Sequence, residues 1–148
     1  MRKELVDMSK FIDKIKQIPD LIHGKGCTDE QLAAAQQILN LTFPAEYVEY
    51  VRVFGYILFD GTEWTGLGMY PNDNEVTGED STVGRTQLEH EINPEFPEKM
   101  FVLEAIGIDC KIVAVDESGT VYYIANNYCE KAFDSISEYL DYCLKHAE

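Results

Sequence analysis

The 148-residue sequence lacks the long apolar runs that mark membrane proteins and secretion signals. Charged residues interrupt every hydrophobic stretch, so no segment approaches the roughly 20 apolar residues that a membrane-spanning helix requires. The N-terminus is basic but has no continuous hydrophobic segment and no small-residue cleavage site, so we do not expect a signal peptide. Internal repeats and low-complexity segments are also missing. With 45% apolar residues, the chain is predicted to fold as one domain over residues 1–148.

Cysteine is sparse, and no two cysteines form a C-x-x-C pair. The four residues Cys27, Cys110, Cys129 and Cys143 are far apart in the sequence. In a chain that is long enough for an ordinary core, this spacing favours reduced, mostly packed thiols in a cytoplasmic protein. The even count leaves two disulfides as an alternative.

Signatures of catalysis and of cofactor binding are absent. The sequence has neither a G-x-S-x-G nucleophile motif nor a glycine-rich phosphate loop. The segment NDNEVTGED resembles a calcium loop, but its twelfth position, counted from Asp73, is Gly84 instead of the required glutamate. The three histidines do not have the spacing of zinc ligands. We therefore predict no metal, no cofactor and no enzyme, and the carboxylate pair Asp60 and Glu63 remains a minor alternative for acid–base chemistry or metal-dependent hydrolysis.

Basic residues are few, and this is the strongest compositional signal. Twelve lysines and arginines face 27 aspartates and glutamates, which gives a formal net charge of −15. Such a charge repels nucleic acids and anionic membranes and attracts basic proteins. Between Asp60 and Glu98 there are ten acids and a single base, Arg85. This uneven distribution suggests an acidic face, although solubility alone could explain the acidity.

Helical periodicity and capping residues predict helices at both ends of the chain. Apolar residues at helical spacing indicate a first helix from Leu5 that Pro19 ends, followed by a loop DLIHGKG. A capping box formed by Thr28 and Gln31 begins a second helix. A third helix has Pro44 in its first turn and Gly55 as the left-handed residue after its end. The remaining two helices are expected to begin after Ser81 and, with a second capping box, at Ser135.

The sequence segments between these helices are predicted to form strands. Residues YILF and TEWTGL flank Asp60-Gly61, a dipeptide that favours a two-residue hairpin turn. KMFVLEAIG, CKIVAVDE and TVYYIAN predict three further strands, the last two joined by a turn at Gly119. This order indicates an α+β domain with a largely antiparallel β-sheet, N-terminal helices and a C-terminal helix packed on the sheet.

The segment LNLTFPAEYVEYVRVFG, followed by a short strand, a turn and Glu63-x-x-Gly66, resembles the SUKH superfamily, the yeast cell-wall-synthesis-regulator-like group. Its members typically have a leucine-proline-x-x-tyrosine helix, here with Phe43 in place of the leucine. KIVAVDESGTVYYI is similar to the family's strand, turn and strand, and SISEYLDYCL to its last helix. The resemblance covers residues 28–144, which leaves 1–27 as an N-terminal helix and loop.

The resemblance implies a non-catalytic α+β domain, because many bacterial members look like immunity proteins that neutralise secreted polymorphic toxins, often nucleases, in the cytoplasm. A nuclease presents a basic surface to phosphates, which an acidic protein complements. A regulatory interaction module without a toxin is the alternative that the fungal members suggest. Acids would steer the partner, and aromatic residues would anchor it, although a sole tryptophan beside a turn is more often packed in the core. The candidate contact residues are Asp60, Glu63, Trp64, Tyr70, Asp73, Glu75, Glu79, Asp80 and Tyr128.

Overall fold

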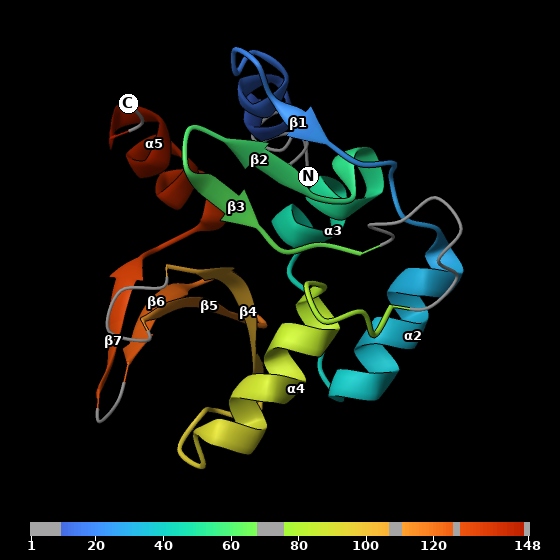
Figure 1. Cartoon of the computed structure of the whole chain (residues 1–148), viewed down its shortest axis with the longest axis vertical. Helices are drawn as coiled ribbons and strands as arrows, with labels where there is room; N and C mark the ends of the chain where they lie inside the picture. The colour runs from blue at the N-terminus through green and yellow to red at the C-terminus, as the bar shows by residue number, and fades with distance from the viewer. Residues whose placement is uncertain (1–9, 68–75, 107–110, 126–127, 147–148) are drawn as a thin grey trace.

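The structure is a computed structural model that describes residues 10–67, 76–106, 111–125 and 128–146. Within these residues the strands form two antiparallel sheets, one of three strands and one of four. Figure 1 shows the three-stranded sheet in the upper half of the molecule and the four-stranded sheet below it at the left. The predicted α+β class with antiparallel pairing is confirmed, but the strands divide between two sheets.

The N-terminal helix is described from residue 10 and continues to residue 16. Phe11, Ile12, Ile15 and Ile18 are buried, as the predicted apolar stripe requires, whereas its first residues lie outside the described part. The predicted loop that follows contains a two-residue strand, β1 (Ile22–His23). Two residues give no periodicity, so the sequence offered no signal for this strand.

Helix α2 (Asp29–Leu39) begins with the predicted capping box. The Thr28 side chain accepts from the Gln31 amide at 3.1 Å, and the Gln31 side chain accepts from the Thr28 amide at 2.9 Å. Helix α3 (Ala45–Phe54) buries Tyr47, Tyr50, Val51 and Phe54. Pro44 is its N-cap and therefore lies one position before the predicted first turn.

Gly55 ends α3 with a φ of 74°, but its ψ of −60° is not the expected left-handed helical value. The Tyr56 amide donates to the Phe54 carbonyl at 2.8 Å, which is the bond of a three-residue γ-turn. The chain then forms the predicted hairpin of β2 (Ile57–Phe59) and β3 (Thr62–Trp64). Asp60 and Gly61 have φ values of 39° and 81°, the two positive values that a type I′ turn demands.

Helix α4 (Thr82–Ile92) begins after Ser81, as predicted, and the Ser81 hydroxyl caps it by accepting from the Gly84 amide at 3.0 Å. The four-stranded sheet follows in chain order as β4 (Met100–Ala105), β5 (Ile112–Asp116), β6 (Val121–Ala125) and β7 (Tyr128–Phe133). Strand β7 was not predicted, because most of its side chains are exposed and no apolar alternation marks it.

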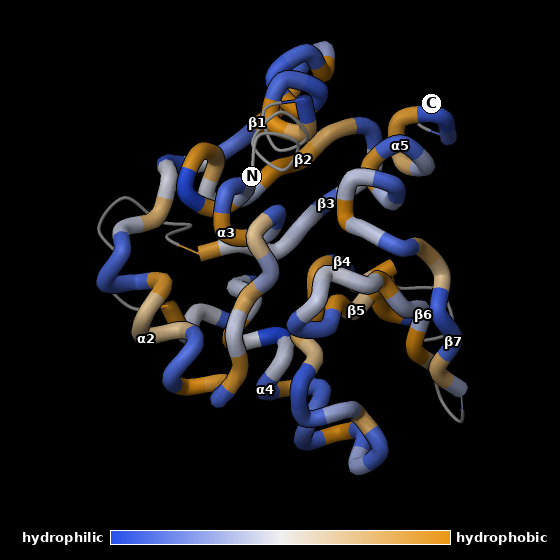
Figure 2. Tube along the Cα trace, turned by 180° about the vertical axis from the view of Figure 1, so that it is seen from behind, coloured by the Kyte–Doolittle hydropathy of each residue, from blue (hydrophilic) through white to orange (hydrophobic). Residues whose placement is uncertain are grey.

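Helix α5 (Ile136–His146) closes the described chain. The Ser135 hydroxyl accepts from the Glu138 amide at 3.1 Å, as predicted, but the Glu138 carboxylate accepts from the Asp134 amide instead of closing the box on Ser135. Ile136, Tyr139, Leu140 and Cys143 form its buried stripe. Figure 2 shows hydrophobic and hydrophilic residues alternating along the helices, as expected of elements that cover a core on one side.

The two sheets are linked where β3 meets β4. The Thr65 amide donates to the Leu103 carbonyl at 2.7 Å, and the Thr65 hydroxyl donates to the Val102 carbonyl at 2.7 Å. A large apolar cluster that includes residues of both sheets, of α3 and of α5 surrounds this link. Cys27 and Cys143 are buried free thiols, as predicted, whereas the free thiol Cys129 is exposed; Cys110 lies outside the described residues.

Candidate functional site

Two neighbouring hollows lie on either side of the Glu63 side chain. The first, of about 250 Å³, lies against the small sheet and is called here the hairpin hollow. Residues of β1, β2, β3 and the turn between β2 and β3 surround it. Its lining consists of Asp20, Ile22, Leu58, Phe59, Asp60, Gly61, Thr62 and Glu63.

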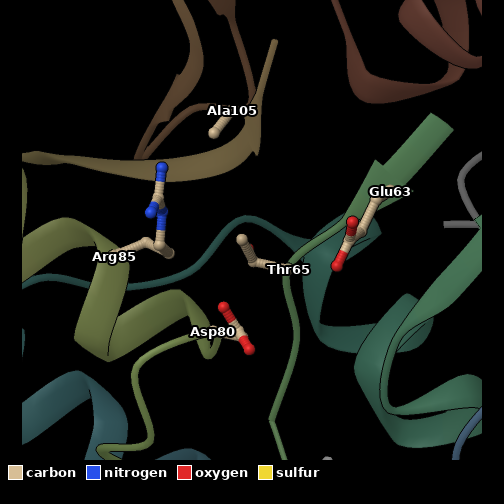
Figure 3. Close-up of a pocket in the computed structure, with 5 residues that line it drawn as sticks. All are labelled: Glu63, Thr65, Asp80, Arg85 and Ala105. Atoms are coloured by element: carbon tan, nitrogen blue, oxygen red, sulfur yellow. The ribbon is translucent and has the colours of Figure 1, made fainter. Parts of the chain in front are cut away.

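The second hollow, of about 160 Å³, lies between β3, β4 and the start of α4 and is called here the α4 hollow. It is lined by Glu63, Thr65, Asp80, Arg85 and Ala105. Figure 3 shows the Glu63 and Asp80 carboxylates on either side of Thr65, with the Arg85 side chain extending from α4 toward β4. Together the two hollows bring Asp20, Asp60, Glu63 and Asp80, the acidic surface, from three separate parts of the sequence to one region of the molecule.

Close backbone packing holds β3 in this position. A Cβ built on Gly66 would lie 1.6 Å from the Gly55 carbonyl oxygen, so only glycine fits there. The Leu67 amide donates to the Gly55 carbonyl at 3.1 Å, and the Thr82 amide donates to the Gly66 carbonyl at 3.0 Å. These bonds tie the end of α3, the segment after β3 and the start of α4 to one another.

A buried hydroxyl network lies beneath the α4 hollow. The Tyr47 hydroxyl donates to the Thr82 hydroxyl at 2.6 Å, and the Thr82 and Thr65 hydroxyls are 2.8 Å apart. The Tyr50 hydroxyl donates to the Thr65 carbonyl at 2.7 Å. A polar network in which every member has a partner restricts its members to one arrangement. The network therefore holds Thr65 at the base of the α4 hollow, beside the exposed Glu63 and Asp80 carboxylates.

Glu104 of β4 is a buried carboxyl that lies close to Glu63 of β3. It is 8% exposed and accepts a hydrogen bond from the Tyr139 hydroxyl of α5. Burial raises the pKa of Glu104, while the hydrogen bond from Tyr139 and the nearby Trp64 indole N–H oppose that rise. Since Glu104 lines neither hollow, we interpret it as a structural residue beneath the site.

Arg85 is the base inside this acidic region. Its side chain is half-buried, and it forms no ion pair among the described residues. Its charge opposes the rise in the pKa of Glu89 that burial causes. The guanidinium group therefore faces the α4 hollow with hydrogen-bonding capacity to spare.

The predicted contact residues do not all lie in one region of the structure. Asp60, Glu63 and Asp80 come together in the acidic surface, and the exposed Glu79 precedes Asp80 without lining either hollow. Tyr128 begins β7, the outer strand of the other sheet, and lines neither hollow. Tyr70, Asp73 and Glu75 lie outside the described residues.

Trp64 needs a correction as a contact residue. Its side chain is fully buried, stacks on Tyr139 with 5.9 Å between ring centroids and meets Tyr50 edge to face. Its indole nitrogen makes no hydrogen bond of ordinary geometry. The alternation of β3 turns Trp64 into the core and Glu63 to the surface, so the packed interpretation of this tryptophan is the correct one.

Sequence reasoning missed Asp20, Ile22 and Arg85 as site residues. Asp20 lies in a predicted loop with a φ of 57°, and Ile22 belongs to the short strand β1. Arg85 carried one signal, because it is the single base in a segment of ten acids. Its position in the lining of the α4 hollow, however, depends on how α4 packs against β4.

The described residues contain no group of three or more histidine, cysteine, aspartate or glutamate side chains placed to hold a metal ion. The three histidines make separate ring contacts, His23 with Phe54, His90 with Phe96 and His146 with Tyr142. Within the same part of the chain, no helix is long and apolar enough to cross a membrane. The two hollows are lined by both charged and apolar side chains.

Comparison with known proteins agrees with the features of the fold. A search of curated proteins gives no significant match. The SUKH_5 family, described as SMI1-KNR4 cell-wall, matches residues 8–145, nearly the whole chain. Of the motif residues, Gly55 and Gly66 form the close backbone contact and Tyr47 belongs to the buried hydroxyl network, whereas Pro44 is the N-cap of α3. The chain therefore belongs to the SUKH_5 family of SMI1-KNR4 cell-wall domains.

Proposed function

We propose that the protein is a non-catalytic immunity protein that neutralises a cognate toxin domain in the cytoplasm. Occlusion is the proposed mechanism: the protein covers the surface with which the toxin binds its own substrate. One observation carries the proposal, namely the gathering of Asp20, Asp60, Glu63 and Asp80 around two hollows of a chain with a net charge of −15. Family membership supports it, since many bacterial SUKH members look like immunity proteins.

The charge of this surface suits a nuclease toxin in particular. A nuclease must attract phosphates, so the surface around its active site is basic. Opposite charges raise the rate of association and disfavour partners of the wrong sign. An acidic protein bound there would repel nucleic acid as well as exclude it sterically.

A regulatory interaction module would use the same surface with a different basic partner. Genome context separates the two proposals, because an immunity gene is expected beside a large open reading frame with a secretion module and a toxic C-terminal domain. The metal-dependent hydrolase alternative would use Asp60 and Glu63. Asp60 already serves the type I′ turn, and the two carboxylates lie among apolar side chains in the hairpin hollow.

The direct test is co-expression of the protein with the C-terminal domain of the neighbouring candidate toxin. Cells should survive induction of the toxin domain only when the protein is present, and the two proteins should copurify. An unrelated acidic protein of similar size serves as the control for charge alone. Cell death despite copurification, or survival without a complex, would contradict neutralisation by occlusion.

A further inference from the structure

The hairpin hollow has an apolar strip along the outer face of the small sheet. Ile22, Leu58 and Glu63 are paired in register across β1, β2 and β3, so their side chains share one face. The opposite face carries Ile57 and Trp64, which are fully buried in the core. Ile22 is 56% exposed and Leu58 is half-buried, so two aliphatic side chains lie at the surface in a row that ends at a carboxylate.

Three carboxylates surround this strip. Asp20 precedes β1, Asp60 lies in the turn, and Glu63 ends the row on β3; all three side chains are exposed. None of them forms an ion pair with a described lysine, arginine or histidine. The hollow thus combines aliphatic surface with negative charge that no described base of the protein neutralises.

We propose that the hairpin hollow receives a lysine or arginine side chain of the partner protein. The aliphatic stem lies against Ile22 and Leu58, and the cationic head lies among Asp20, Asp60 and Glu63. This inference rests on the proposed function, since it names the chemistry by which the basic partner is held. Long basic side chains bury their methylene stems on apolar surface while the charge stays at the polar rim, which matches this arrangement.

Size and charge disfavour other occupants. A volume of about 250 Å³ is below the roughly 300–1,000 Å³ of typical small-molecule pockets and suits one large side chain. A purely apolar side chain would remove water from three carboxylates without giving them a partner, and burial of unpaired charge is costly. An acidic side chain would add a fourth negative charge at the same place.

NMR titration with n-butylguanidinium, a mimic of the arginine side chain, tests this proposal without the toxin. We expect the largest shift changes at the amides of Ile22, Leu58 and Asp60 to Glu63, with saturation at millimolar concentrations. Guanidinium and n-butanol serve as separate controls for the charge and for the stem. Both should shift these amides several-fold less at equal concentration. Shifts spread evenly over all acidic regions, or equal shifts with guanidinium alone, would overturn the proposal.

A charge-removing variant makes the titration specific. Asp20→Asn, Asp60→Asn and Glu63→Gln together remove three charges, and asparagine tolerates the φ values of 57° and 39° at the first two positions. The dissociation constant for n-butylguanidinium should rise roughly tenfold, because the variant removes the negative charges that attract the cationic head. The control variant Glu91→Gln, Glu95→Gln and Glu98→Gln has the same net charge and should bind as the unmodified protein does.

Ile22→Ser tests the apolar half of the hollow. It should weaken n-butylguanidinium binding several-fold and leave the weaker response to guanidinium unchanged. Equal affinity in the unmodified protein, the triple variant and Ile22→Ser would overturn the proposal. A failure of toxin neutralisation alongside a positive titration would count against the proposed function and leave the side-chain site standing.

Discussion

At the residue scale, Glu63 and Gly66 of the Glu-x-x-Gly motif do different work. Glu63 is exposed and lines both hollows, whereas Gly66 is buried against the backbone of Gly55. Because Glu63 and Gly66 are three positions apart, the backbone passes from the acidic surface to the junction with α3 within this short segment. The motif therefore links a proposed contact residue, Glu63, to the backbone packing at Gly66.

Gly66→Ala should reduce the free energy of unfolding by at least about 2 kcal/mol, because its Cβ would overlap the Gly55 carbonyl group and force the backbone apart. Gly61→Asn is the matched control. No atom lies within 4 Å of a Cβ at Gly61, and asparagine tolerates a positive φ, so about 1 kcal/mol or less should be lost. Urea unfolding of both variants measures the difference, and similar losses would contradict the close approach at Gly66.

Glu104 makes the free energy of unfolding depend on pH, and the sign of this dependence follows from its raised pKa. Burial raises the pKa of Glu104 above its ordinary value of 4.5, so the folded state binds this proton more tightly than the unfolded state does. The contribution of protonated Glu104 to the free energy of unfolding is fully present below pH 4.5. It is lost as the pH rises through the pKa of Glu104 in the folded state.

Glu104→Gln should therefore lose less stability than the unmodified protein as the pH rises, since glutamine still accepts from Tyr139 and carries no charge. The free energy of unfolding, measured in urea between pH 4 and pH 8, should show a gap in favour of the variant that widens with pH. Glu98→Gln removes a charge from an exposed position and controls for the general repulsion in an acidic protein. Parallel curves for Glu104→Gln and the unmodified protein would contradict the raised pKa.

At the scale of the element, the sequence predicted most of what local chemistry determines. The Thr28 cap, the start of α4 after Ser81, the Asp60-Gly61 turn and the stripe of α5 each depend on residues a few positions apart, and all are present. Strands β1 and β7 were missed, because β1 is too short to show a period and β7 has an exposed, irregular pattern. Pairing with neighbouring strands, which is a tertiary effect, makes these segments extended.

The candidate site was less predictable, since it depends on where distant elements meet. Asp60 and Glu63 are close in sequence, but their approach to Asp20 requires the pairing of β1 with β2. The placement of Glu63, Asp80 and Arg85 around one hollow depends on the tertiary packing of β3, β4 and α4, which also forms the buried bonds among Tyr47, Thr65 and Thr82. No local pattern encodes either contact.

Ser81→Ala should weaken α4 at the wall of the α4 hollow. The variant removes the cap on the Gly84 amide and the bond that the Ser81 hydroxyl donates to the Val76 carbonyl at 2.7 Å, so about 1–2 kcal/mol of stability should be lost. Ser135→Ala removes the cap of α5 and should cost about 1 kcal/mol.

Amide hydrogen exchange distinguishes the two caps. Exchange should accelerate in the first turn of α4, at Gly84 and Arg85, only in Ser81→Ala, and in the first turn of α5, at Glu138, only in Ser135→Ala. A uniform acceleration over the whole chain in both variants would mean that neither cap acts locally.

At the scale of the whole molecule, the position of the charges is more informative than the net charge of −15 itself. The described ion pairs are at exposed sites away from both hollows, such as Lys14 with Asp141 and Arg52 with Asp29. Surface pairs of this kind add little stability. The acidic surface, by contrast, has carboxylates that form no ion pair with a described base, and they lie around an apolar strip and beside a half-buried arginine. This arrangement supports the proposed basic partner.

The association rate of the protein with the candidate toxin domain, measured by stopped flow from low to high salt, tests the central claim most directly. Asp60→Asn, Glu63→Gln and Asp80→Asn together should slow association about tenfold or more at low salt and flatten its dependence on ionic strength. The control Glu91→Gln, Glu95→Gln and Glu98→Gln removes as many charges from exposed positions away from the hollows and should change the rate only slightly. Equal slowing by both variants, or an unchanged rate in the first, would contradict a binding site at the acidic surface.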